Sequence, residues 1–257
     1  MARGTALSWL PVLVAVVVSP LSAQVNIERL RAGEEQKRLS GSLGFNLAAR
    51  TGNVELVQFG LDGRLDHVSE LVTTFLMGSG DLGWKGGDRF INEGMLHLRQ
   101  VYRRGSSLRP EVFAQVNYNE SRLLDFRALV GGGIRVRLFR NPTARFWWGS
   151  AYMFEYERLD LLPDAIHAQR TSVHRWSNYL SSRIRFNERA TLLWIVYVQP
   201  QLDEIKDLRI LSDTSLGAEL AGPTSLLVSL RMHYDSRPPD GKESLDTTIR
   251  TGVTIEF

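Results

Sequence analysis

Apolar and polar residues alternate with a period of two in long segments of this chain, from residue 40 to its end. Phe154 and Tyr156, for example, alternate with Glu155 and Glu157. Because successive side chains of a β-strand point to opposite faces, this pattern predicts strands with one apolar face and one charged face. Such a chain needs a fold in which the two faces of every strand meet different surroundings.

The alternating segments number twelve, and most of them run for 10 to 16 residues. Strands of soluble proteins usually have about 5 to 6 residues, whereas a tilted strand needs about 9 to 11 to cross a bilayer. We therefore expect an all-β fold, a single closed antiparallel transmembrane β-barrel of about 12 strands at residues 40–257. The expected strands are Ser40–Ala49, Val54–Arg64, Val68–Gly78, Arg89–Arg103, Leu108–Asn119, Leu124–Phe139, Ala144–Glu157, Ser172–Phe186, Ala190–Leu202, Leu208–Leu220, Thr224–Asp235 and Leu245–Phe257.

Charged residues recur on one face of segment after segment, and aromatic residues gather near both ends of the apolar face. In a soluble sandwich the apolar face would turn inward. The repeated charged face instead favours a barrel that is apolar outside and polar inside. The connections agree with this orientation, because short ones alternate with mostly longer ones such as 79–88 and 158–171.

Residues 1–23 have the composition of a secretory signal peptide. Arg3 precedes an apolar run at 7–18, and small residues close the segment. The run is shorter than the roughly 20 apolar residues of a membrane-spanning helix. We expect this signal peptide to be cleaved, which leaves a charged periplasmic lead-in at 24–39 before the barrel.

The last segment alternates up to the final residue, with Val253, Ile255 and Phe257 on one face and Thr254 and Glu256 on the other. This pattern is typical of the C-terminal insertion signal that the barrel-assembly machinery reads. Together with the signal peptide it predicts a location in the outer membrane of a Gram-negative bacterium. Outer-membrane lipid and the assembly machinery are the expected partners.

The composition and the residue spacing contain no pattern typical of catalysis, metal binding or nucleic-acid binding. The chain has no cysteine, and its five histidines lack the spacing of metal ligands. His174 and Ser177 lie three residues apart on an expected strand, so they point to opposite faces and make no catalytic pair. Basic residues are scattered and form no stripe for successive phosphates. We expect no catalytic, cofactor-binding or metal-binding residues, no enzyme activity and no nucleic-acid partner.

The charged faces of the expected strands would line the lumen, with arginine in modest excess. A barrel of about 12 strands lies between small barrels filled with side chains and porins with open channels. Two hypotheses follow: a narrow pore or binding barrel for small polar or anionic solutes, or a non-conducting structural or stress-related barrel with a salt-bridged lumen. A lipid-modifying enzyme of the outer membrane is a third. The expected lumen residues are Glu93, Arg99, Glu111, Arg127, Arg135, Glu155, Glu157, Arg175, Arg183, Arg185, Arg209, Asp213, Glu219, Arg231, Arg250 and Glu256.

Three short stretches carry a resemblance to a known family: Thr51-Gly52-Asn53, the run PEVFAQ at 110–115 and the run RALVGGGIR at 127–135. With these stretches in this order, the chain resembles the YdiY-like salt-induced outer-membrane proteins, also named domain of unknown function 481. The resemblance covers most of residues 40–257. The resemblance implies an outer-membrane barrel. It brings no catalytic residues, because the function of that family is unassigned.

Overall fold

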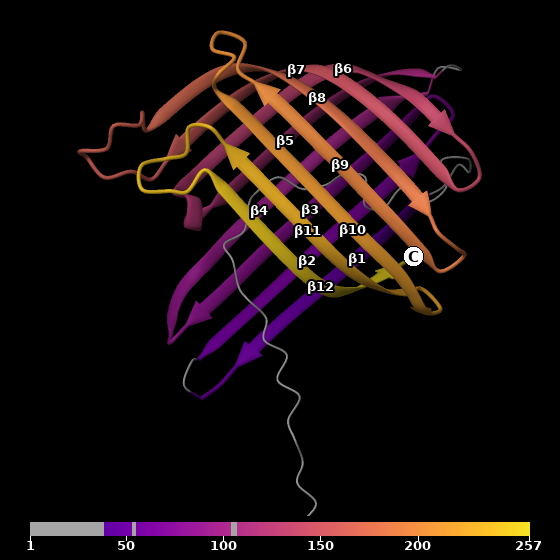
Figure 1. The fold of residues 1–257 in the computed structure, drawn as a ribbon, viewed down its shortest axis with the longest axis horizontal. Helices are drawn as coiled ribbons and strands as arrows, with labels where there is room; N and C mark the ends of the chain where they lie inside the picture. Colours follow the sequence, from indigo (N-terminus) through magenta and orange to yellow (C-terminus); the bar gives the residue numbers. More distant parts are fainter. Residues whose placement is uncertain (1–38, 53–54, 104–106) are drawn as a thin grey trace, which may run out of the picture.

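The structure, a computed structural model, describes residues 39–52, 55–103 and 107–257. Within these residues the chain forms a closed barrel of twelve antiparallel strands (Figure 1). Each strand pairs with its neighbours in sequence, and β1 pairs with β12, so the expected closed antiparallel barrel is confirmed. The elements are β1 (Leu39–Arg50), β2 (Leu56–Val68), β3 (Val72–Lys85), β4 (Asp88–Tyr102), β5 (Leu108–Asn119), the 3-10 helix η1 (Glu120–Arg122), β6 (Leu124–Arg140), β7 (Ala144–Leu159), β8 (Arg170–Arg185), β9 (Ala190–Pro200), β10 (Leu208–Ala221), β11 (Thr224–Asp235) and β12 (Leu245–Glu256).

The third strand differs most from its predicted position. It was expected at 68–78, followed by a long connection at 79–88, whereas β3 extends to Lys85. The polar residues after Gly78 resemble a loop in sequence, but Asp81 is buried on the inner face and the strand continues through it. The turn is made by the Gly86-Gly87 pair, in which both residues have a positive φ.

Connections alternate between the two rims of the barrel. We call the rim with the start of β1 and the end of β12 the terminal rim, and the other the opposite rim (right and left in Figure 1). The longest described connections, 160–169 and 236–244, lie at the opposite rim. There η1 also begins, because the Asn119 side chain accepts a hydrogen bond from the Arg122 backbone N–H at 3.1 Å.

The outward face of the barrel is apolar. In β11, Val228 is 39% exposed and Leu230 is 38% exposed. The residues that alternate with them are buried, with Ser229 at 5% and Arg231 at 9%. The same alternation of buried and exposed residues runs through β4 and β5. Soluble monomers rarely expose a continuous apolar surface larger than a few hundred Å². The described barrel thus needs apolar surroundings.

The seam between β1 and β12 is shorter than the other strand pairs. Its register covers residues 42–45 of β1 and 253–256 of β12. By contrast, β1 pairs with β2 along all of Leu39–Arg50. Gly41 and Phe257 exchange two further backbone hydrogen bonds, of 2.9 and 3.0 Å. The described pairing of the seam therefore lies in the half near the terminal rim.

We predict that Val228→Arg impairs folding into lipid vesicles more than Ser229→Ala does. Val228 faces outward, where an arginine near the midplane of a bilayer costs about 2 to 4 kcal/mol, whereas Ser229 faces inward. Urea unfolding of both variants in vesicles measures the difference. Equal losses of stability in the two variants would contradict this assignment of the inward and outward faces.

Candidate functional site

Side chains from strands that are not neighbours in the sheet meet inside the barrel. Tyr179 of β8 donates to the two carboxylate oxygens of Glu111 of β5 at 3.0 and 3.1 Å. Arg250 of β12 lies 3.0 Å from Asp81 of β3 and 3.3 Å from Glu93 of β4. Since these strands lie apart in the sheet order, the contacts must cross the lumen. The charged faces of the strands therefore line a shared interior.

The densest group of charges lies near the opposite rim, and we call it the arginine–carboxylate cluster. Arg209 of β10 is its centre. Its guanidinium lies 2.6 Å from Glu155 and 3.2 Å from Glu157, both of β7, and 2.9 Å from Asp235 of β11. Arg127 of β6 pairs with Glu157 as well. These side chains are at most 9% exposed, so the ion pairs are shielded from bulk water.

Arg175 of β8 connects the cluster to the adjoining connection. Its guanidinium lies 3.2 Å from Glu155 and 2.9 Å from Asp207, which follows β9. Arg175 also donates to the backbone carbonyl of Gln199 at 3.2 Å. One arginine thus connects two carboxylates and the backbone of a third strand.

A second set of charges lies beside the cluster, toward β12. Arg231 pairs with Asp213 at 3.2 Å on the neighbouring strand. Arg122 of η1 lies 3.1 Å from Asp246 and hydrogen-bonds to His233. Burial lowers the pKa of Arg122 to about 10, although the Asp246 carboxylate opposes this shift. At neutral pH the Arg122 guanidinium therefore keeps its charge.

Stacked aromatic rings fill part of the interior nearer the terminal rim. His97 lies between Phe75 and Phe113, with ring centroids 6.3 and 6.2 Å apart. Arg64 lies over the Phe75 ring at 4.5 Å, and Arg99 over the Phe113 ring at 5.0 Å. This alternation of cations and rings crosses β2 to β5 and provides cation–π contacts in a desolvated interior.

Arginines gather around one tryptophan at the terminal rim. The Arg135 guanidinium lies 4.0 Å from the Trp147 ring centroid, Arg109 4.9 Å and Arg137 5.8 Å. Arg109 and Arg135 are also register partners on β5 and β6. These three arginines place positive charge beside Trp147 at this end of the interior.

Most predicted lumen residues with described side chains lie in this interior, and Arg183 and Arg250 are only partly buried there. Arg185 and Glu219 are exposed at the terminal rim, because the strands extend past the enclosed part. The side chain of Glu256 lies outside the described part of the structure. The buried members are Glu93, Arg99, Glu111, Arg127, Arg135, Glu155, Glu157, Arg175, Arg209, Asp213 and Arg231.

Several interior residues were not predicted from the sequence. Asp81 was missed because its segment was assigned to a connection, and Arg64 because its strand was expected to end there. His97 and Trp147 were missed because only charged residues of the inner faces were assigned to the lumen. The parity of β4 carried the missing signal, since His97 shares the face of Glu93.

The structure separates the two residues tested for catalysis. Ser177 is 3% exposed and accepts a hydrogen bond from the Gln199 side chain at 3.0 Å inside the barrel. His174 lies on the outward face, 2.6 Å from the Tyr152 hydroxyl. Among the described residues, no group of His, Asp and Glu has the arrangement of a metal site. No helix in this part of the chain has the length and hydropathy to cross a membrane.

Three solved structures are similar to this chain. The NanC porin has a TM-score of 0.50 at 10% identity, over 84% of this chain and 98% of that chain. The translocator domain of the autotransporter NalP from Neisseria meningitidis has a TM-score of 0.47 at 11% identity, over 84% and 87%. For the KdgM porin the values are 0.41 and 11%, over 86% and 99%. The likeness to the NanC porin shows the fold alone.

The sequence comparisons give one positive result. A family model described as "Protein of unknown function, DUF481" matches residues 42–257. The search of curated proteins gives no match. The resemblance inferred from the three short stretches is therefore confirmed for most of the chain.

We predict that Arg209→Met destabilises the barrel by about 3 to 5 kcal/mol, because it removes the arginine that three buried carboxylates share and leaves Asp235 without this ion pair. Arg237→Met is the matched control. It breaks an exposed pair with Glu204, for which about 0 to 1 kcal/mol is expected. Unfolding in urea, followed by tryptophan fluorescence, gives both values. A similar loss in the two variants would contradict a structural role for the arginine–carboxylate cluster.

Proposed function

The chain belongs to the DUF481 family of proteins of unknown function, and on this premise we propose that it is an integral outer-membrane barrel whose lumen is closed by buried ion pairs. The arginine–carboxylate cluster carries this proposal. A wide aqueous channel would leave such charges hydrated, as in the large porins. Here Arg209, Glu155 and Glu157 are buried against one another.

The outward face supports the membrane location. Apolar side chains cover it along the strands, and closure of the sheet gives the backbone groups partners within the barrel. The signal peptide at 1–23 and the lead-in at 24–39 are part of the same proposal, although residues 1–38 lie outside the described part of the structure, and Leu39 already belongs to β1. The insertion signal at Val253, Ile255 and Phe257 stays a prediction.

We expect the mature protein to fractionate with outer membranes. In detergent it should migrate differently before and after heating, because a closed sheet leaves few strand edges unpaired and resists unfolding. Membrane fractionation and electrophoresis of unheated and heated samples measure both properties. Recovery of the mature chain in the soluble periplasmic fraction would contradict the membrane proposal.

We predict that the unmodified barrel shows no conductance steps in planar lipid bilayers, and that the double variant Arg209→Ala, Glu157→Ala does. The double variant removes one positive and one negative side chain that meet across the interior, so it widens the lumen without changing its net charge. The double variant Arg237→Ala, Glu204→Ala removes an exposed pair and should stay silent.

Conductance steps from the unmodified barrel would instead favour a second candidate function, that of a narrow pore for small anionic solutes. The arginines around Trp147 at the terminal rim favour it, because fixed positive charges concentrate anions in a confined mouth. Such a pore should show anion preference in its reversal potential under a salt gradient. Arg183→Glu with Arg185→Glu should then weaken that preference.

A further inference from the structure

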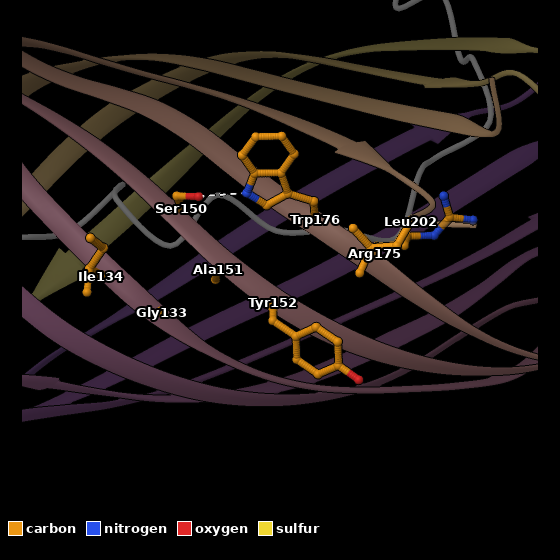
Figure 2. Close-up of a pocket in the computed structure, with 8 residues that line it drawn as sticks. All are labelled: Gly133, Ile134, Ser150, Ala151, Tyr152, Arg175, Trp176 and Leu202. Carbon is orange, nitrogen blue, oxygen red and sulfur yellow. Dashed lines mark hydrogen bonds between the residues drawn. The ribbon is translucent and has the colours of Figure 1, made fainter. Parts of the chain in front are cut away.

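A groove of about 390 Å³ lies on the outward face of β6, β7 and β8. Figure 2 shows its lining, which includes Ile134, Ser150, Tyr152, Trp176 and Leu202. Tyr152 and Trp176 are register partners, and each is 51% exposed. Small residues, Gly133, Ser150 and Ala151, line the groove between these larger side chains.

The polar groups in and beside the groove have hydrogen-bond partners. Arg175, which also lines the groove, is 2% exposed, and its guanidinium bonds to Glu155 and Asp207. The Trp176 indole donates to the Ser150 hydroxyl at 2.7 Å, as the dashed line in Figure 2 marks. The Tyr152 hydroxyl and His174 Nδ1 form a second hydrogen bond of 2.6 Å. Since a polar group without a partner is costly in apolar surroundings, these two bonds make the wall suitable for hydrocarbon. The groove therefore fits an apolar chain better than a polar ligand.

A continuous outward path leads from the groove to the opposite rim. Along β7 and β8 the next outward register pairs are Phe154 with His174, then Tyr156 with Ser172, and finally Arg158 with Arg170. The six residue steps from Tyr152 to Arg158 span about 20 Å of strand. On a strand tilted by 35–45° this is roughly 15 Å along the barrel axis, or one leaflet of a hydrocarbon core about 30 Å thick.

Two arginines end this path. Arg158 and Arg170 lie directly opposite each other, an arrangement that is unfavourable for like charges unless an anion lies between them. Asp125 pairs with Arg158, which leaves the three groups with a net positive charge. Guanidinium groups bind phosphate through paired N–H donors. The end of the path is thus suited to a phosphorylated headgroup.

We propose that this surface binds lipid A, the phosphorylated and acylated glycolipid of the outer leaflet. One phosphate would lie at Arg158 and Arg170, and one acyl chain would reach the groove beside Trp176. A phosphate monoester carries about −1.5 to −2 charges, so it can satisfy both guanidinium groups, whereas the diester of a phospholipid carries a single charge. This inference rests on the outer-membrane location proposed above.

The test measures retention of added lipid A by the purified barrel in detergent, with native mass spectrometry. We expect the unmodified protein to retain lipid A. The double variant Arg158→Gln, Arg170→Gln should retain it about tenfold more weakly, because two charge-assisted bonds are lost. Ile134→Trp should also weaken retention, because the larger side chain fills the groove.

Two matched controls should retain lipid A like the unmodified protein. Arg89→Gln removes an exposed arginine from the same rim, and Ile249→Trp enlarges an outward isoleucine on β12, away from the groove. Heat-dependent migration shows that each variant is folded. Equal retention in all variants, or retention of phosphatidylglycerol with the same dependence on Arg158 and Arg170, would overturn the proposal. Membrane fractionation tests the location independently.

Discussion

Backbone hydrogen bonding between neighbouring strands is the constraint on which the rest of this structure depends. A peptide group that faces lipid has no partner outside the protein, so each strand needs a neighbour on both sides. The sheet meets this need by closing, with β1 against β12, and with strands of 11 to 17 residues in the described part of the chain. Register then determines the direction of every side chain, and the alternating sequence becomes an apolar outside and a charged inside.

Closure also forces the charged faces into a space that bulk water does not fill. A guanidinium buried alone would cost several kcal/mol, which explains why Arg209 contacts carboxylates from both β7 and β11. Buried ion pairs contribute little net stability compared with apolar packing, but the loss of one partner is costly. Removal of one member of the arginine–carboxylate cluster is therefore expected to cost more stability than the intact cluster contributes.

The sequence predicted the architecture because strand alternation is a local property that survives in every segment. It even predicted the ends of β5 and β11, where turn residues bound a clear pattern. The predicted position of β3 was wrong, because a strand whose inner face is polar and whose other residues are small has the same sequence pattern as a loop. The sequence could not predict that Arg250 pairs with Asp81 and Glu93. Such contacts depend on the diameter of the barrel and the stagger of its strands, and no local pattern records either one.

The short seam between β1 and β12 is expected to form late in the folding of the barrel. It joins the first strand to the last, so it is the least local pairing in the sheet and carries the largest loop-closure entropy. It also offers few backbone bonds in return, at residues 42–45 and 253–256. The other strands can curl into a hairpin meander before these two meet. Until then the nascent sheet has two open edges, and its lifetime in that state sets its exposure to aggregation.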